Sequence, residues 1–331
     1  HEDAIPASNV NLCVEFLSMS LTTPTSMTTI KAWLSAIRLR TLPLAAAVIL
    51  LPSGILALQG LVQGPVVLHA LWTAFLLQIL SNLANDYGDA VSGADRHRIG
   101  PARMVASGQI SVSAMRKAIL GVAALALISG VWLLIPLAQS GPAQAGGQGR
   151  FWGWLALGIA AVVAAIRYTV GSNPYGYRGL GEVAVLIFFG PVAYAGMRTL
   201  HGQNMALGDW GPALATGLLA ASVLNLNNLR DREQDAQAGK ITLAVRMGNR
   251  RALYFQSFLV MTAVVAMLVF AWSRSVPLLW GWSLMAVAYS NLLRKIWQVQ
   301  EPRNYDAFLK PTALYLLGMA LMPWILHWRT M

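Results

Sequence analysis

Asn82–Asp95 reads N-L-A-N-D-Y-G-D-A-V-S-G-A-D, which places two asparagines and three aspartates at the end of a long apolar segment. A second string of this kind, Asn225–Asp235, reads N-L-N-N-L-R-D-R-E-Q-D and ends another apolar segment in the second half of the chain. Carboxylates at the end of a bilayer-spanning helix are costly and usually functional. We therefore expect the two acidic strings to face each other and to form one site.

The composition indicates a membrane protein. Of the 331 residues, 56% are hydrophobic and 11% are charged, whereas a soluble domain carries about 25% charged residues. We predict an all-α integral membrane protein, because nine apolar segments have roughly the 20 residues that span a bilayer. These segments cover residues 41–59, 66–84, 115–138, 151–170, 182–200, 210–228, 252–273, 276–296 and 311–328. Residues 1–28 are a polar lead that we expect to lie outside the core, and residues 29–331 form one transmembrane domain.

The basic residues are distributed unevenly between the two sides of the predicted membrane. Of the 24 Lys and Arg residues, 20 fall on the side of the N-terminus and 4 on the other side. This split follows the positive-inside rule, so the N-terminus and the loops after the even-numbered segments are predicted to be cytoplasmic. The same distribution accounts for the net charge of +11 without a nucleic-acid partner. An odd number of spans places the C-terminus on the outside.

The polar residues of the first string recur at spacings of three and four, which places them on one face of a helix. They are Asn82, Asn85, Asp86 and Asp89. Asp95 follows after a glycine-containing turn that can fold it back toward them. Asn and Asp also cap helix ends, but a cap needs one such residue and this string supplies several. Asn82 lies one turn inside the apolar stretch, and we predict that it contacts the substrate.

The second string carries Asn227, Asp231 and Asp235 at strict spacings of four. Its Asn227-x3-Asp231 matches Asn85-x3-Asp89 of the first string, which suggests an internal repeat. Clusters of oxygen ligands without His or Cys select hard cations, above all Mg²⁺, which is typically held by one or two carboxylates and substrate phosphates. We therefore predict a Mg²⁺ site that binds a diphosphate. The predicted metal ligands are Asn85, Asp89, Asp95, Asn227, Asp231 and Asp235.

Two cations and a tyrosine-rich loop complete the predicted site. Arg103 and Lys240 lie just beyond the two acidic strings, and we predict that they bind the diphosphate; the alternative is that they only anchor the protein to the cytoplasmic face of the membrane. In the loop Arg167–Glu182, Tyr168 and Tyr175 are predicted to offer π faces to the substrate. Tyr177 in the same loop could do so as well, although a flexible loop with interface tyrosines explains this composition equally well.

These residues resemble the UbiA superfamily of intramembrane aromatic prenyltransferases. The resemblance extends from Ala32 to the last apolar segment and is strongest in Leu77–Asp95, Tyr168–Glu182 and Asn225–Gly248. The superfamily patterns are N-D-x-x-D-x-x-x-D for the first string and D-x-x-x-D for the second. The second pattern fits without departure.

The first pattern fits Asn85, Asp86 and Asp89, but Asp95 stands six residues after Asp89 instead of four. Such lengthening resembles the 1,4-dihydroxy-2-naphthoate branch of the superfamily more than the 4-hydroxybenzoate branch.

The resemblance implies nine helices around a central cavity in the inner membrane of a bacterium, with the active face toward the cytoplasm. It further implies transfer of a polyprenyl group from an all-trans-polyprenyl diphosphate to 1,4-dihydroxy-2-naphthoate, within the membrane lipid and with Mg²⁺ as cofactor. Diphosphate and CO₂ are lost and demethylmenaquinone is formed. The catalytic residues that it implies are Asp86, Asp89, Asp231 and Asp235.

Two other functions fit parts of this pattern. A prenyltransferase of the same superfamily could use another aromatic acceptor, such as 4-hydroxybenzoate, homogentisate or a chlorophyllide. A cation-coupled transporter would also repeat acidic helices, but it would hold its ions near the middle of the membrane. Because both acidic strings lie at the ends of apolar segments, the sequence favours the enzyme.

Overall fold

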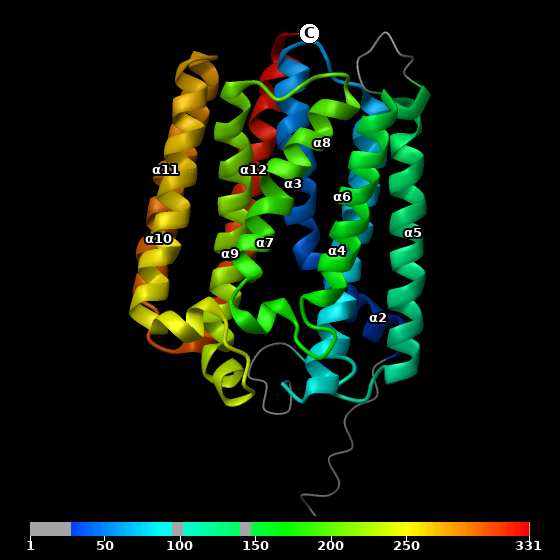
Figure 1. Cartoon of the computed structure of the whole chain (residues 1–331). Helices are drawn as coiled ribbons and strands as arrows, with labels where there is room; N and C mark the ends of the chain where they lie inside the picture. The colour runs from blue at the N-terminus through cyan, green and yellow to red at the C-terminus, as the bar shows by residue number, and fades with distance from the viewer. Residues whose placement is uncertain (1–27, 95–101, 140–146, 331) are drawn as a thin grey trace, which may run out of the picture.

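The computed structural model describes residues 28–94, 102–139 and 147–330. Within these ranges the chain is helical and contains no strand, and its long helices run side by side as one bundle (Figure 1). The α-helices are α2 (Thr29–Ile37), α3 (Leu42–Leu58), α4 (Gly64–Ser92), α5 (Val112–Gln139), α6 (Gly147–Arg167), α7 (Gly181–Ile187), α8 (Ala193–Leu200), α9 (Trp210–Gln237), α10 (Leu243–Trp272), α11 (Val276–Trp297) and α12 (Asp306–Thr330). Short 3₁₀ segments join them at η1 (Leu39–Thr41), η2 (Tyr175–Arg178), η4 (Leu207–Asp209) and η5 (Pro302–Tyr305).

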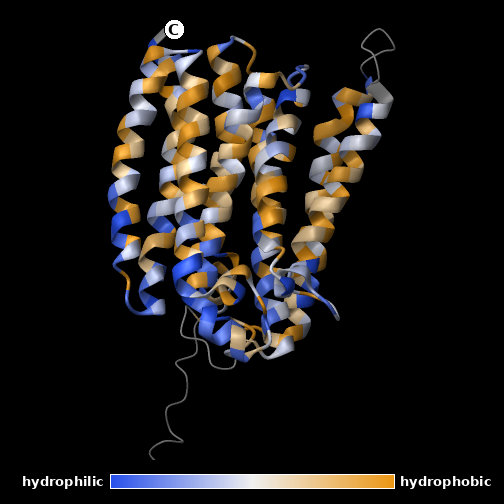
Figure 2. Cartoon of the chain, turned by 60° about the vertical axis from the view of Figure 1, so that its left-hand side comes forward, coloured by the Kyte–Doolittle hydropathy of each residue, from blue (hydrophilic) through white to orange (hydrophobic). Residues whose placement is uncertain are grey.

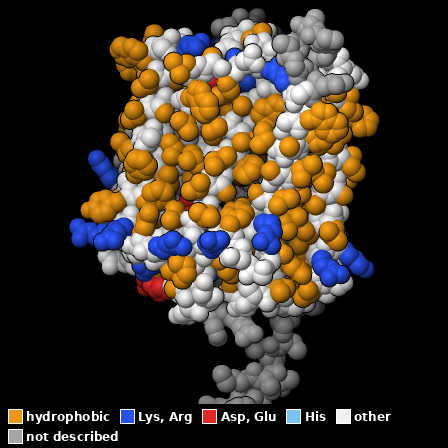
Figure 3. All heavy atoms as spheres, in the orientation of Figure 1, with side chains coloured by type: hydrophobic (Ala, Val, Ile, Leu, Met, Phe, Trp, Pro, Cys, Tyr) orange, Lys and Arg blue, Asp and Glu red, His pale blue; other side chains and the backbone are white. Residues whose placement is uncertain are grey.

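Nine spans in the described part of the chain are long and apolar enough to cross a membrane, which confirms the predicted all-α membrane fold. Hydrophobic residues follow the middle of the bundle, and hydrophilic residues gather at the end away from the C-terminus (Figure 2). On the outer surface, apolar side chains cover the flank of the bundle above a band of Lys and Arg (Figure 3). The chain is thus a multi-pass membrane protein with one strongly charged end.

The fifth span is broken in the middle. Its two helices, α7 and α8, are joined by the π-helical segment Phe188–Val192, in which Gly190 has non-helical angles (φ −100°, ψ −106°) and Pro191 cannot donate a backbone hydrogen bond. A Cβ atom on Gly190 would lie 2.7 Å from the carbonyl oxygen of Ala213 in α9. A glycine is therefore required for the close contact between this break and α9.

The helices that carry the acidic strings extend beyond the apolar segments marked in the sequence. The apolar segments were predicted to end at residues 84 and 228, but α4 continues to Ser92 and α9 to Gln237. Hydropathy falls where Asn and Asp begin, although backbone hydrogen bonding does not. Helix α4 ends where Gly93 adopts a left-handed conformation (φ 80°) and donates to the carbonyl of Ala90. Asn82–Asp89 and Asn225–Asp235 therefore lie on the last turns of regular helices.

A central cavity of about 420 Å³ lies within the bundle. Helices α3 to α9 and α12 line it, and most of the lining side chains are apolar. Its polar lining residues are concentrated where α4 and α9 approach their acidic strings, and they include Asn82, Asn85, Tyr168, Tyr175 and Asn227. The cavity thus joins an apolar interior to a polar end that lies one helical turn before Asp89 and Asp231.

Candidate active site

The two aspartates at the centre of the first string have different surroundings, although both are buried. The carboxylate of Asp86 accepts hydrogen bonds from the backbone N–H groups of Met104 and Val105, each at 2.9 Å. It thereby fixes the chain that returns from α4 toward α5. These contacts anchor the loop that carries Arg103, and the catalytic role predicted for Asp86 stays a prediction.

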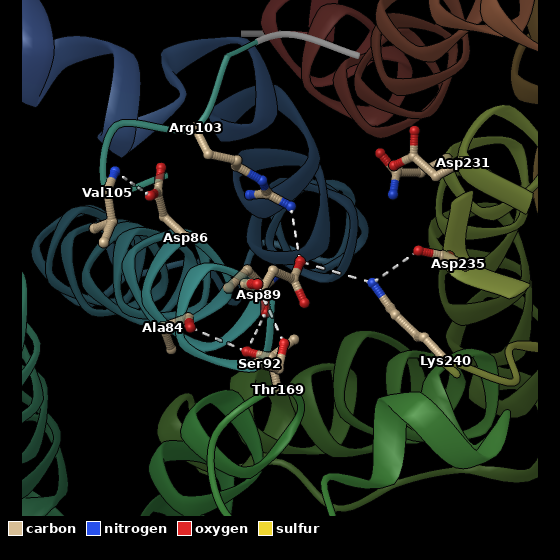
Figure 4. A network of polar contacts seen from close by, with 12 residues as sticks. Ala84, Asp86, Asp89, Ser92, Arg103, Val105, Thr169, Asp231, Asp235 and Lys240 are labelled. Carbon is tan, nitrogen blue, oxygen red and sulfur yellow. Dashed lines mark hydrogen bonds and ion pairs between the residues drawn. The ribbon is translucent and has the colours of Figure 1, made fainter. Parts of the chain in front are cut away.

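Asp89, one turn further along α4, points into a cluster of charges (Figure 4). Its Oδ2 lies 3.1 Å from Nη2 of Arg103 and 3.7 Å from Nζ of Lys240, and its Oδ1 accepts a hydrogen bond from the Tyr177 hydroxyl at 2.8 Å. Both cations that the sequence predicted as diphosphate ligands thus meet at one carboxylate.

Lys240 connects the two acidic strings. Its Nζ lies 3.4 Å from Oδ1 of Asp235 at the end of α9 as well as near Asp89 of α4 (Figure 4). Burial alone lowers the pKa of this amine, but the adjacent Asp89 and Asp235 outweigh burial and raise it above its ordinary value. Lys240 therefore remains a cation at neutral pH.

The second string is held mainly by one arginine. Arg230 forms a two-pronged contact with the carboxylate of Asp231, at 2.6 and 2.7 Å, and donates to Oδ1 of Asn227 at 2.7 Å. The same guanidinium pairs with Asp306, the first residue of α12. Asp235 is less restrained: its Oδ2 is buried and has no hydrogen-bond partner among the described residues.

Arg103 is a buried cation at the same end of the bundle. Burial lowers the pKa of its guanidinium to about 10, against the opposing effect of Asp231. The side chain is still positively charged near neutral pH. Arg103 and Lys240 thus place two cations around Asp89, where a diphosphate would need counter-charges.

The predicted asparagines form the border between the charged cluster and the cavity. Asn82 lines the cavity, and its amide donates to the carbonyl of Ile37 at 2.8 Å and to the Thr41 hydroxyl at 2.9 Å. Oδ1 of Asn85 accepts a hydrogen bond from the Thr169 hydroxyl at 3.2 Å. Asn82 therefore also ties α4 to the chain between α2 and α3.

Two of the predicted tyrosines line the cavity beside these amides. Tyr168 and Tyr175 pack edge to face with ring centroids 5.5 Å apart, and the Tyr175 hydroxyl donates to the carbonyl of Ala164. Burial raises the pKa of Tyr175 to about 12 and raises that of Tyr168 well above its ordinary value. Both rings are neutral at physiological pH and present apolar faces with one polar atom.

Sequence reasoning missed several contacts of this site. We assigned a π face to Tyr177, and Nζ of Lys240 lies 5.4 Å from the centroid of its ring. The sequence did not indicate that its hydroxyl bonds to Asp89 and to Ser92. The roles of Arg230 and Asp306 as partners of the second string gave no pattern in the sequence, because they depend on helix packing. Asp95 was predicted as a metal ligand and lies outside the described residues.

A divalent cation fits the chemistry of the donor set, although no group of three or more His, Cys, Asp or Glu side chains forms a ready-made metal cage in the described ranges. Mg²⁺ needs few protein ligands, because water and substrate phosphates complete its shell. Carboxylate and amide oxygens from α4 and α9 converge on the cluster, and Asp235 Oδ2 has no partner in the described part of the protein. The oxygen donors available are thus of the kind that bind a divalent cation together with phosphate.

Fold and site define a helical multi-pass membrane protein whose apolar cavity ends beneath a charged cluster contributed by two helices. Residues 46–317 match the model of the UbiA prenyltransferase family. The chain therefore belongs to the UbiA prenyltransferase family, and the resemblance seen in the sequence is confirmed.

The chain is also similar to individual proteins of this family. The chain is 39% identical over 305 residues to the 1,4-dihydroxy-2-naphthoate octaprenyltransferase of Escherichia coli (strain K12), covering 89% of this chain and 96% of the relative. It is 42% identical over 245 residues to the Haemophilus influenzae protein of the same name, covering 73% and 77%. A solved structure, a UbiA homolog from Archaeoglobus fulgidus bound to GPP and Mg²⁺, matches with a TM-score of 0.61 at 18% identity, covering 89% of this chain and 98% of that one.

Proposed function

We propose that this protein transfers a polyprenyl group from an all-trans-polyprenyl diphosphate to 1,4-dihydroxy-2-naphthoate and releases diphosphate and CO₂. The direct product is demethylmenaquinol, the hydroquinone whose later oxidation gives demethylmenaquinone. The observation that carries the proposal is the order of the site: an apolar cavity, a border of amides and tyrosines, and then Asp89, Asp235, Arg103 and Lys240. This order matches a donor with a hydrocarbon tail and an anionic head. Relatives at 39% and 42% identity carry this activity in their names.

The cations and the carboxylates have different roles at the diphosphate group of the donor. Arg103 and Lys240 bind diphosphate oxygens and stabilise the charge that develops when the allylic C–O bond breaks. Carboxylate oxygens of Asp89, Asp231 and Asp235, with amide oxygens of Asn85 and Asn227, would hold Mg²⁺. When bound, Mg²⁺ neutralises the diphosphate that would otherwise be repelled by these carboxylates.

The cavity and its border serve the reacting carbon and the acceptor. Apolar walls exclude water from the allylic cation, which water would otherwise capture. Tyr168 and Tyr175 present ring faces to the cation and to the aromatic acceptor. Because the acceptor loses CO₂, its ring regains aromaticity without loss of a ring C–H proton.

We further propose that the charged end faces the cytoplasm of a bacterium and that the protein lies in its inner membrane. The distribution of Lys and Arg supports this orientation, since 20 of 24 fall on that side. The named relatives are bacterial proteins.

The test is an assay of the purified protein with Mg²⁺, octaprenyl diphosphate and one aromatic acceptor at a time. We expect prenylated naphthol and CO₂ with 1,4-dihydroxy-2-naphthoate, far slower turnover with 4-hydroxybenzoate, and loss of activity in EDTA that added Mg²⁺ restores. A preference for the benzoate would overturn the proposed acceptor. Full activity in EDTA would overturn the proposed metal.

A further inference from the structure

One buried carboxylate near the cavity has no part in the diphosphate site. Glu182 is 3% exposed, and its Oε1 accepts a hydrogen bond from the amide of Asn228 at 2.8 Å. Its Oε2 is buried without a hydrogen-bond partner, and it makes no ion pair within the described ranges. A buried carboxylate with an unused oxygen destabilises the fold, and such groups are concentrated at functional sites.

Glu182 lies at the end of the cavity wall formed by α7. Val185, three residues further on in α7, lines the cavity, so Glu182 lies one turn before it on the same side of this helix. A Cβ atom on the preceding Gly181 would lie 2.8 Å from a ring carbon of Tyr168 and 3.3 Å from its hydroxyl oxygen. The hydroxyl of Tyr168, a cavity-lining residue, is therefore packed against the first turn of α7, where Glu182 stands.

The electrostatics of Tyr168 agree with this placement. Burial is the main cause that raises the pKa of its hydroxyl, and the charge of Glu182 is the next, followed by Asp89, Asp235 and Tyr175. Asp89 and Asp235 are each paired with a cation, whereas Glu182 is held by a neutral amide. Of these three carboxylates, Glu182 is therefore the one that has no paired cation among the described residues.

The proposed reaction, on which this inference rests, needs such a group. The ring carbon that bears the carboxylate forms a bond to the allylic carbon with a π electron pair, and the diphosphate leaves with the pair of the C–O bond. The neighbouring ring hydroxyl then loses its proton and becomes a carbonyl. Loss of CO₂ returns an electron pair to the ring, and the carbonyl oxygen takes a proton back.

We propose that Glu182 is the residue that stores this proton, acting through Tyr168. The acceptor hydroxyl gives its proton to Tyr168 Oη while the tyrosine proton passes to Glu182 Oε2, directly or through one water molecule. After CO₂ has left, the proton returns along the same path, so no net proton is consumed. Tyr168 contacts the acceptor, and Glu182 is a positioning and proton-storing residue behind it.

The first test measures turnover of naphthoate by Glu182→Gln, Tyr168→Phe and the double variant. Each single variant should lower kcat about 10²- to 10⁴-fold and leave the KM for the polyprenyl diphosphate unchanged. The double variant should be no slower than the slower single variant, because both substitutions interrupt the same proton path. Tyr194→Phe is the matched control, since its hydroxyl meets a buried carboxylate, Asp209, near the other end of the bundle; it should retain the wild-type kcat.

A second readout separates proton transfer from structural support. Above the pKa of its own hydroxyl the naphthoate arrives already deprotonated, so Glu182→Gln should recover activity relative to wild type as the pH rises. The variant leaves Asp89, Asp235 and Tyr175 around Tyr168 in place. Glu182→Asp should retain part of the activity at neutral pH.

Two results would overturn the role of Glu182 while wild type is active: single variants within threefold of wild type, or a double variant whose loss is the product of the single losses. If Glu182→Gln does not fold, as judged by thermal unfolding, Tyr168→Phe and Glu182→Asp decide the same question. A wild-type protein that makes no prenylated naphthoate would instead overturn the proposed function, and this inference with it.

Discussion

Both ends of the bundle bury a carboxylate against an arginine, but among the described residues only the charged end has buried carboxylate oxygens without a hydrogen-bond partner. At the end opposite the acidic strings, Arg198 pairs with Asp209 at 3.3 Å and donates to Gln59 Oε1 and to the carbonyl of Asn204. Asp209 also accepts hydrogen bonds from the backbone N–H of Ala206 and from the Tyr194 hydroxyl. This network closes on itself and joins α3, α8 and the start of α9.

At the charged end, the equivalent network of Asp89, Lys240 and Asp235 joins α4 to α9 but does not close. Oδ2 of Asp235 and Oε2 of Glu182 are buried with no hydrogen bond from the described residues. A buried acceptor without a partner costs about 1–3 kcal/mol. Ion pairs of similar appearance thus fix the fold at one end and leave carboxylate oxygens available to a ligand at the other.

The largest expected difference comes from replacing the central carboxylate at each end of the bundle with an amide. Asp89→Asn should lower turnover about 10³-fold or more, because it removes the charge that faces Arg103 and Lys240. Asp209→Asn should instead lower the free energy of unfolding by about 3 kcal/mol and leave the turnover of the folded protein unchanged. Assays per folded molecule and thermal unfolding in detergent measure both. Loss of turnover in Asp209→Asn would show that the ends are not functionally distinct.

The next largest effect on activity is expected at Lys240, which bridges Asp89 of α4 and Asp235 at the end of α9. Lys240→Gln should lower kcat/KM for the polyprenyl diphosphate about 10²-fold, since a charged hydrogen bond to the donor is lost. Arg246→Gln is the control, because Arg246 is an exposed cation at the same end that donates to the carbonyl of Arg178. Initial rates at varied donor concentration separate the two. Equal losses would indicate general attraction of the anionic donor and no specific bridge.

A smaller effect is expected from the support of the second string. Asp306→Asn removes one partner of Arg230 and leaves its contact with Asp231 intact. Asp306 is about a third exposed, so solvent weakens the pair. We expect turnover to fall about fivefold and the Mg²⁺ concentration for half-maximal rate to rise. An unchanged Mg²⁺ dependence would argue that Arg230 needs no help from α12.

The smallest effect is expected at the exposed pair of Arg232 and Glu233, which lies on α9 between Asp231 and Asp235. Glu233→Gln should change the free energy of unfolding by less than about 0.5 kcal/mol and turnover by less than twofold. Chemical unfolding and the standard assay measure this. A large loss would mean that acidity of the whole string matters, in addition to the residues that face inward.

The repeat seen in the sequence predicts the site only in outline. Matching Asn85-x3-Asp89 with Asn227-x3-Asp231 makes Asp89 and Asp231 equivalent. In the structure, however, Lys240 joins Asp89 to Asp235, while Asp231 is engaged by Arg230. Spacing along a helix fixes which residues share a face, but the rotation of one helix against another fixes which of them meet.

The sequence by itself determined the nine spans, the charged end and the residue types of the site, because hydropathy, charge and helical spacing are local properties. It also indicated Arg103 and Lys240 by their position beside the acidic strings. Only the tertiary structure decided that Asp86 anchors a loop, that Tyr177 contacts Asp89, and that Glu182 lies beside Tyr168 with an oxygen unused. These roles depend on which helix ends approach each other, and that approach is set by packing between residues far apart in the chain.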